Sequence, residues 1–253
     1  YGDLDISIIS QKPSNRLPIK TTIWSPNSRP QLYQIIDDEI KEGRQVFVVC
    51  PLIEDSEGSE VKSVNEEVKR LKAGHFKHRA IAILHGKMKD EEKAEVMQQF
   101  AAKQIDMLVS TTVIEVGIDI PNASVMLIEG ADTFGLAQLH QLRGRVGRGK
   151  DQGYCYLIPS TSAKPSKRLR AMESTTNGFK LAEMDLELRG PGAIYGSKQH
   201  GSLDLKIANI SDTALIKMAR DSAEQFVSSQ LKLSDYPYLS KRVQKSLTLT
   251  YLN

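Results

Sequence analysis

Four cations and three glycines fall within residues 141–150, whose sequence is Gln-Leu-Arg-Gly-Arg-Val-Gly-Arg-Gly-Lys. Arginine binds phosphate in a fixed, two-pronged geometry that lysine lacks, and glycine lets the backbone approach a ligand closely or adopt a positive φ. Several guanidinium groups are too costly to bury together without partners. On residue types alone, a solvated basic turn is the simpler interpretation of this stretch, and a phosphate-binding loop is the functional one.

A second candidate is the segment 110–121, which follows a predicted strand and has the sequence Ser-Thr-Thr-Val-Ile-Glu-Val-Gly-Ile-Asp-Ile-Pro. The hydroxyls of Thr111 and Thr112 suit contact with phosphate at a strand end, and Gly117 permits a tight turn. Asp119 is suited to accepting a hydrogen bond from a ribose hydroxyl, as acidic residues do in other nucleotide-binding folds. The alternative is an ordinary strand-to-helix connection in which the threonines cap a helix, and the segment alone favours neither interpretation.

The elements that must position these segments alternate between strand and helix. Unbroken apolar runs predict buried strands, and apolar residues spaced three and four apart predict helices. The predicted strands cover 45–50, 81–84, 107–109, 125–128 and 154–158, and the predicted helices include one from Pro30 to Gly43, one through 64–71 and one that begins at 90–92. This alternation predicts an α/β fold with a parallel sheet covered on both faces, whose ligands bind at the carboxyl ends of the strands.

The pattern changes after Pro159. Residues 160–167 have the composition of a linker. Two short helices are predicted at 167–174 and 178–185, a glycine-rich loop at 189–201 and an amphipathic helix at 212–228, and the residues from Tyr236 carry no signature. We therefore predict a leading segment 1–29 with β-like runs at 5–9 and 19–24, a parallel-sheet domain 30–160, and a mainly helical extension 161–253.

Composition bounds the class of protein. The chain has 253 residues and a formal net charge of +3, which does not by itself indicate a nucleic-acid partner. Cys50 and Cys155 lie in apolar runs, so we expect buried thiols in a reducing compartment. No run is long enough to cross a membrane and no signal peptide opens the chain, so we expect a cytoplasmic protein. Because the first residue is Tyr1 rather than methionine, we also expect a piece of a longer protein.

Other clusters predict no chemistry. His75 and His78 have a metal-like spacing, but no cysteine or carboxylate pair completes a zinc site nearby, so no metal is expected. His140 and His200 are not accompanied by a Ser or Cys nucleophile in a recognisable motif. The basic residues of the helix through 64–71 are expected to form a solvated face; they are Lys62, Lys69, Arg70 and Lys72.

In combination, the segments resemble a known family. Gln-x-x-Gly-Arg-x-x-Arg at 141–148 resembles the sixth motif of superfamily 2 helicases and translocases, and 111–121 resembles the fifth. Together with Phe-Gly-Leu-Ala-Gln-Leu-His at 134–140, they resemble the RecG family of branch-migration helicases and, nearly as closely, the transcription-repair coupling factors. Three further stretches favour RecG: Asp-Leu-Glu-Leu-Arg-Gly-Pro-Gly at 185–192, Lys-Ile-Ala-Asn at 206–209 and Gly-Asp-Leu-Asp at 2–5.

The resemblance implies a RecA-like second motor lobe followed by a helical hairpin and a loop. Arg145 and Arg148 would reach the γ-phosphate of ATP that is held by a neighbouring lobe. The residues implied to contact or position the nucleotide are Gly117, Asp119, Gln141 and Gly144. Those implied to touch the DNA backbone are His85, Gly86, Thr111 and Thr112. The hairpin would cover 166–185 and the coupling loop 186–201, with Arg189 and Gln199 as coupling residues.

The chain contains no P-loop sequence, Gly-x-x-x-x-Gly-Lys-Ser/Thr, and no Asp-Glu-x-His or Asp-Glu-x-Gln box. The family carries these in its first motor lobe, which is accompanied by a wedge domain, so the expected cofactor, ATP with Mg²⁺, would be bound mainly there. We therefore expect a monomeric C-terminal fragment, inactive alone, of an ATP-dependent helicase that remodels stalled forks and branched or duplex DNA. The alternatives are a coupling translocase that acts on RNA polymerase and a non-enzymatic nucleic-acid-binding module.

Overall fold

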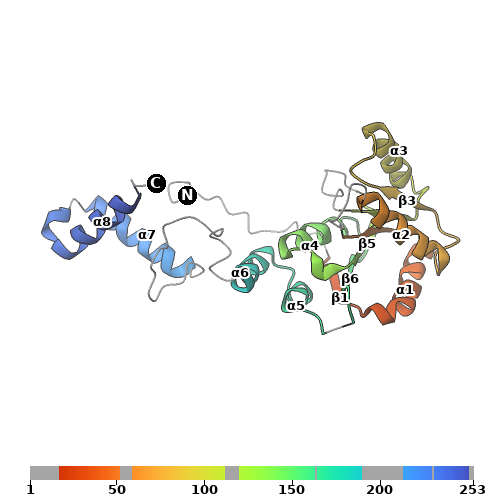
Figure 1. Ribbon diagram of the computed structural model, residues 1–253, viewed down its shortest axis with the longest axis horizontal. Helices are drawn as coiled ribbons and strands as arrows, with labels where there is room; N and C mark the ends of the chain where they lie inside the picture. The colour runs from red at the N-terminus through yellow and green to blue at the C-terminus, as the bar shows by residue number, and fades with distance from the viewer. Residues whose placement is uncertain are drawn as a thin grey trace. The chain divides into compact units, whose positions relative to one another are not determined.

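The computed structural model describes residues 17–51, 59–111, 120–162, 164–189, 213–229 and 231–250 (Figure 1). The chain separates into two compact units, Tyr1–Asp185 and Leu186–Asn253. The predicted β-like run at 5–9 and the glycine-rich part of the predicted loop, 190–201, lie outside the described residues. The limits that the sequence suggests for the three parts of the chain stay predictions.

A six-stranded parallel sheet organises the first unit. Its strands are β1 (Lys20–Ile23), β2 (Gln45–Val49), β3 (Ile81–Leu84), β4 (Met107–Ser110), β5 (Ala123–Glu129) and β6 (Tyr154–Ile158). They are ordered β1-β6-β5-β2-β4-β3, and every neighbouring pair is parallel. β2, β4 and β5 are buried along their whole length, which explains why their sequences are mostly apolar rather than alternating. The predicted α/β fold with a parallel sheet is confirmed.

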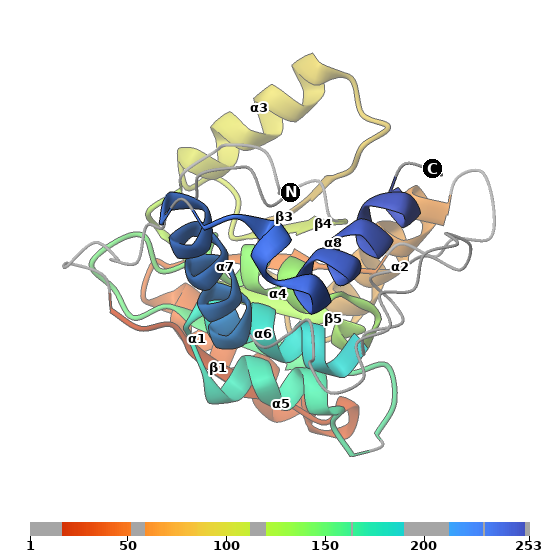
Figure 2. The same cartoon turned by 90° about the vertical axis from the view of Figure 1, so that its left-hand side faces the viewer.

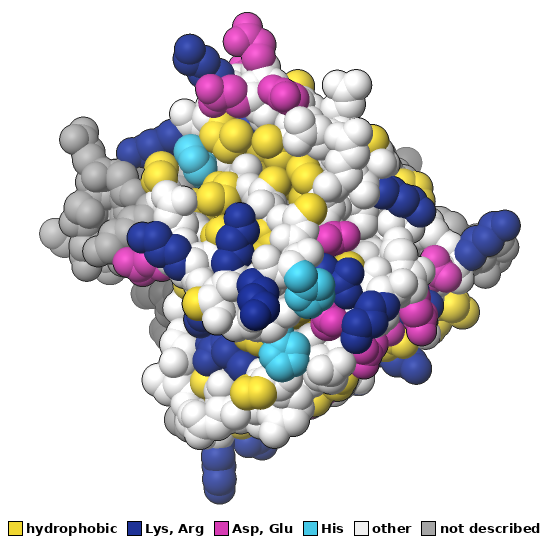
Figure 3. Space-filling view, turned by 90° about the vertical axis from the view of Figure 1, so that its right-hand side faces the viewer, with side chains coloured by type: hydrophobic (Ala, Val, Ile, Leu, Met, Phe, Trp, Pro, Cys, Tyr) yellow, Lys and Arg dark blue, Asp and Glu magenta, His cyan; other side chains and the backbone are white. Residues whose placement is uncertain are grey.

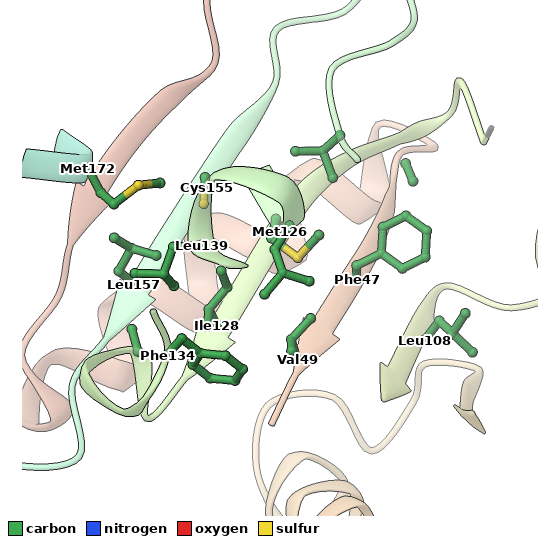
Figure 4. Packing of buried hydrophobic residues seen from close by; sticks show 14 of the residues in the cluster. Phe47, Val49, Leu108, Met126, Ile128, Phe134, Leu139, Cys155, Leu157 and Met172 are labelled. Atoms are coloured by element: carbon green, nitrogen blue, oxygen red, sulfur yellow. The ribbon is translucent and has the colours of Figure 1, made fainter. Parts of the chain in front are cut away.

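Helices cover both faces of this sheet (Figure 1). They are α1 (Arg29–Lys41), α2 (Ser59–Ala73), α3 (Asp90–Ala101), α4 (Leu136–Arg143), α5 (Lys167–Ser174) and α6 (Gly178–Arg189). Consecutive strand residues point to opposite faces, so Val48 and Val49 belong to different hydrophobic clusters. Val48 packs in the cluster to which α1 and α2 contribute, and Val49 in the cluster to which α3, α4 and α5 contribute (Figure 4).

The ends of these helices follow the local signals in the sequence. Pro30 lies in the first turn of α1, and Gly43, with a φ of 83°, follows the end of that helix. α3 begins with three acidic residues, and the backbone N–H of Lys89 donates to the Glu92 carboxylate at 3.2 Å. The Oγ of Ser166 accepts a hydrogen bond from the backbone N–H of Leu169 at 3.3 Å and caps α5. The predicted starts of these helices are therefore confirmed.

Three helices differ from the sequence-based expectation. α5 and α6 form the two expected consecutive helices (Figure 2), but α6 continues to Arg189, so 186–189 is helical rather than part of a loop. α4 was not predicted, because an eight-residue helix is too short to show a clear periodicity. In the second unit, α7 (Thr213–Ser228) matches the predicted helix, whereas α8 (Pro237–Thr250) covers residues that carried no signature.

The second unit is held together locally. The ring of Phe226 near the end of α7 contacts the ring of Tyr236 just before α8, with the centroids 5.3 Å apart and the planes nearly perpendicular. This edge-to-face arrangement is a favourable geometry for an aromatic pair. Over the described ranges of both units, no helix combines the length and the apolar character that crossing a membrane requires.

Both cysteines lie in the core of the first unit. Cys50 and Cys155 are free and buried. Burial raises the pKa of both thiols, that of Cys155 to about 12. Because the thiolate is the reactive form of cysteine, both side chains act as small apolar groups, and the prediction of buried thiols is confirmed.

Charged side chains form a network at the carboxyl ends of the central strands. The carboxylate of Glu129, the last residue of β5, pairs with Arg29 at 2.6 Å and with Arg70 at 2.7 Å. Arg70 also pairs with Glu67, one turn earlier on α2, at 2.5 Å. Arg70 therefore belongs to this charged network, while its side chain remains 39% exposed. On the face shown in Figure 3, Lys and Arg side chains are interspersed with Asp and Glu, so no large field of one sign covers it.

The buried amide of Gln45 is hydrogen-bonded through both its nitrogen and its oxygen. Gln45 is 2% exposed, and its Nε2 donates to the carbonyl oxygens of Phe100 at 2.6 Å and Ile105 at 2.7 Å. Its Oε1 accepts from the Nδ2 of Asn122 at 3.0 Å. These bonds tie the start of β2 to the end of α3 and to the turn before β5.

Replacing Gln45 with leucine tests this bonding. Gln45→Leu removes the side-chain donor from two carbonyl oxygens, of which that of Phe100 still accepts from the backbone N–H of Lys103. Each unsatisfied buried group costs about 1–3 kcal/mol. We expect the free energy of unfolding in urea to fall by about 1–3 kcal/mol. Gln98→Leu on the exposed side of α3 is the matched control and should change it by less than about 0.5 kcal/mol. Equal effects of the two changes would contradict the structural role of Gln45.

The pH dependence of stability tests the environment of Glu67. Burial, with a contribution from the nearby Glu129 charge, raises the pKa of Glu67 from 4.5 to about 7 despite the opposing effect of Arg70. The folded state therefore holds this proton more tightly than the unfolded chain. The stabilisation is fully present below pH 4.5 and is lost as the pH rises through about 7, by at most about 1.4 kcal/mol per pH unit. Urea unfolding at a series of pH values should show a decline in the wild type that Glu67→Gln lacks, and identical profiles would argue against it.

Candidate functional site

The loop that carries Arg145 and Arg148 lies at the edge of the sheet that is formed by the amino ends of the strands. The opposite edge is formed by their carboxyl ends. α4 follows the carboxyl end of β5, and the loop joins the end of α4 to the start of β6. The Nε2 of Gln152 donates to the carbonyl oxygen of Pro18 at 2.7 Å, just before β1. A Cβ on Gly149 would lie 2.6 Å from the carbonyl oxygen of Pro121, just before β5. The expectation that ligand contacts gather at the carboxyl ends of the strands does not hold for these arginines.

Close backbone contacts fix the shape of this loop. Gly147 has a φ of 66°, in the left-handed region that favours glycine. A Cβ on Gly153 would lie 2.8 Å from the Cα of Gly147, so the backbone leaves no room for a side chain at 153. Between the two arginines, Val146 is 1% exposed and belongs to the hydrophobic core. The loop is therefore anchored to the sheet on both sides of its arginines.

The residues implied to meet the nucleotide lie around the end of α4. Arg145 and Arg148 are both half-buried, and the Nε of Arg148 donates to the carbonyl oxygen of Gly144 at 3.2 Å. Gly144 is the C-terminal cap of α4, and Gln141 is exposed on its last turn. The structure thus brings these four residues together on one rim.

Arg143 is a functional candidate whose position the sequence interpretation missed. It is 2% exposed, and its Nη1 donates to the carbonyl oxygens of Met172 at 2.8 Å and Thr175 at 2.9 Å. Its Nη2 donates to the Nδ1 of His140 at 3.0 Å. Burial lowers the pKa of the Arg143 guanidinium. The usable signal was its spacing of four residues from Leu139, which places both on the buried face of α4.

The residues implied to touch DNA lie at the opposite edge. β3 and β4 are neighbours in register, with Leu84 paired to Ser110, so His85 and Thr111 follow these strands side by side. Thr111 is fully buried, and its carbonyl oxygen accepts from the Oγ of Ser110 at 2.8 Å. His85 is half-buried, and its Nδ1 has no hydrogen-bond partner among the described residues. Gly86 is exposed.

The predicted site residues therefore divide between two edges of the sheet. The backbone of Arg189 ends α6, and four further predicted residues lie outside the described ranges: Thr112, Gly117, Asp119 and Gln199. Within the described ranges, no group of three or more His, Cys, Asp or Glu side chains is arranged to hold a metal ion. The arrangement suits recognition of phosphate by arginine at one edge of the sheet and contacts with the DNA backbone at the other.

Comparison with known families places two parts of the chain. Residues 28–150 match the family described as helicase conserved C-terminal domain. Residues 175–248 match the family described as ATP-dependent DNA helicase RecG, domain 3, C-terminal. The first match covers most of the sheet and the arginine loop, and the second covers the helices that follow α5.

Whole-chain similarity points the same way. A protein of Synechocystis sp. named ATP-dependent DNA helicase RecG is 45% identical over 97% of this chain and 30% of its own length. A protein of the same name from Aquifex aeolicus is 46% identical over 97% of this chain and 32% of its own length. A solved structure of RecG bound to a three-way DNA junction is 43% identical, with a TM-score of 0.63 over 76% of this chain and 25% of that chain. The chain thus spans about a third of the length of these two relatives, and it belongs to the RecG family.

Proposed function

We propose that this chain is the second motor lobe of an ATP-dependent DNA helicase that remodels stalled forks and branched DNA in recombination and repair. The observation that carries the proposal is the anchored loop at 144–149, which holds two arginines at one rim of a RecA-like sheet. The match of residues 175–248 to the RecG domain supports branch migration over the transcription-coupling alternative. The related RecG structure contains a three-way DNA junction, which supports branched DNA as the substrate.

In this proposal, the phosphates of ATP and its Mg²⁺ are held mainly by a P-loop lobe elsewhere in the protein, because this chain has no P-loop sequence. Arg145 and Arg148 would reach the γ-phosphate across the interface and stabilise the charge that develops during transfer. Arginines that act in this way accelerate phosphoryl transfer by about 10³ to 10⁵. The residues proposed to contact or position the nucleotide beside them are Gly117, Asp119, Gln141 and Gly144.

The opposite edge of the sheet would face DNA. We assign backbone contacts to His85, Gly86, Thr111 and Thr112, and coupling to Arg189 and Gln199. Contacts of this kind are made to phosphate and sugar, so binding would be independent of sequence and would weaken with salt. Because 112–119 joins Thr111 at one edge to Ile120 at the other, a single segment would connect the DNA contacts to the nucleotide contacts.

Arg145→Ala tests the proposed role of the loop in a full-length protein that joins this chain to a P-loop lobe. We expect the DNA-stimulated ATPase rate to fall by about 10³ or more, because the transition-state charge loses a cation. The dissociation constant for a three-way junction should change by less than about twofold, because the phosphate contacts that set DNA affinity lie elsewhere. Steady-state ATPase and fluorescence anisotropy measure the two quantities.

Lys150→Ala is the matched control, because it removes one exposed charge from the same loop. Its ATPase rate should stay within about twofold of the wild type, as expected for a change at the surface. If Arg145→Ala instead lost ATPase activity and DNA affinity to the same extent, Arg145 would be a DNA-binding residue and the proposal would be wrong.

A further inference from the structure

Two half-buried aromatic side chains, Trp24 and Tyr154, lie at one margin of the sheet. β1 is the last strand in the order and pairs with β6, and Tyr154 is the first residue of β6. Trp24 and Tyr154 pack with the cluster of α1 and α2, whereas Ile23 packs with the cluster on the opposite face. Because side chains alternate along a strand, the exposed residues Lys20 and Thr22 share the face of the two rings.

The buried ring of Tyr156 holds both of these rings from behind. Tyr156 is 5% exposed, and its ring lies parallel to that of Tyr154, with the centroids 6.0 Å apart and the planes at 10°. The ring of Trp24 meets that of Tyr156 edge-on, with the centroids 6.5 Å apart. The indole N–H of Trp24 donates to the Oγ1 of Thr22 at 3.0 Å. The orientation of both half-buried rings is therefore fixed before any ligand binds, which lowers the entropic cost of binding.

A lysine lies over one of the rings. The Nζ of Lys20 is 5.9 Å from the centroid of the Tyr154 ring, within the range of a cation–π contact. Among the described residues, no carboxylate pairs with Lys20. Burial, and then the charge of Glu39, raises the pKa of Tyr156, but the Glu39 carboxylate is itself paired with Arg44. The surface therefore combines two aromatic rings with a cation whose charge is not neutralised by an ion pair.

We propose that Trp24, Tyr154 and Lys20, here called the β1–β6 platform, bind single-stranded DNA by stacking on its unpaired bases. Aromatic rings stack on bases of any sequence, and a lysine beside them suits contact with the phosphate backbone. The faces of bases inside a duplex are covered by their neighbours, so only an unpaired strand can reach the rings. This inference rests on the proposed function, because remodelling branched DNA separates base pairs and produces unpaired strands.

The alternative is that these rings only cover the margin of the sheet, since aromatic residues are common in strands and pair across them. The two cases differ in their dependence on the bases. An abasic oligonucleotide of the same length keeps every phosphate and lacks the bases. Damage to the fold weakens the binding of both ligands by the same factor. The ratio of the dissociation constant for the abasic oligonucleotide to that for oligothymidylate therefore reports stacking alone.

Tyr154→Leu is the direct test, in the full-length protein that joins this chain to a P-loop lobe, without ATP. Leucine keeps an apolar side chain on the strand but has no ring. Fluorescence anisotropy with labelled oligonucleotides of about 12 nucleotides measures the ratio, which we expect to fall by at least about fivefold. Tyr154→Phe keeps the ring and should stay within about twofold of the wild type. Tyr238→Leu is the matched control, because Tyr238 is 89% exposed on α8 in the second unit, and it should leave the ratio unchanged.

Lys20→Gln tests the contact with phosphate separately. We expect it to weaken the binding of both oligonucleotides alike. The slope of the logarithm of the binding constant against the logarithm of the salt concentration should become shallower by about 0.7, as expected for the loss of one phosphate contact to a single strand. An unchanged slope would contradict the role of Lys20 in the platform.

Photocrosslinking locates the bound strand without any substitution. An oligonucleotide that carries iodouracil in place of thymine should crosslink to Trp24 or Tyr154 in the wild type, as identified by mass spectrometry of the peptides. Circular dichroism establishes that each variant is folded, and Trp24→Leu, with the same expected fall in the ratio, serves if Tyr154→Leu is not.

An unchanged ratio in the folded variants, equal losses for the two oligonucleotides in Tyr154→Leu, or crosslinks confined to other residues would overturn the platform. A raised KM for ATP in Tyr154→Leu with an unchanged ratio would assign the ring to the base of the nucleotide and would overturn it as well. Because binding is measured without ATP, a wild-type protein that lacks DNA-stimulated ATPase would contradict the proposed function without altering the ratio.

Discussion

At the end of α4, a guanidinium that is buried among neutral hydrogen-bond acceptors connects the helices of the first unit. Arg143 meets backbone carbonyl groups at the end of α5 and an imidazole on its own helix, and it is 2% exposed. A charge in this position costs desolvation energy that only well-directed hydrogen bonds offset. The positions of α4, α5 and α6 are therefore interdependent, because loss of any one partner leaves a buried cation with an incomplete set of bonds.

The sequence was most informative where one physical requirement dominated. Strands buried on both faces require apolar residues throughout, and the runs in β2 and β5 predicted the parallel sheet for that reason. α1 was bounded by Pro30 and Gly43, which act through backbone geometry alone. The signals failed where several requirements overlap. α4 is short and carries Gln, His and Arg among its leucines, so its apolar face could be recognised only once Arg143 was known to be buried.

The candidate site shows the same division. Residue types and spacing identified the loop with Arg145 and Arg148, but not the edge of the sheet on which it lies. The general preference for ligands at the carboxyl ends of strands points to the edge with His85 and Thr111. The unrecognised α4 carries the chain back to the other edge, and the two arginines therefore lie opposite the carboxyl ends of the strands. The pairing of Arg70 with Glu129 was not predicted either, because Glu129 is distant in sequence and lies on a strand.

The burial of both sulfur atoms has a practical consequence for observing movement in this chain. Cys50 and Cys155 are the only cysteines in its sequence, and their buried, protonated thiols are poor nucleophiles. A cysteine engineered at an exposed position would consequently be the sole group open to a maleimide dye. Pairs of such labels on the sheet and on the helical hairpin would report distances by energy transfer without prior removal of the native sulfur atoms.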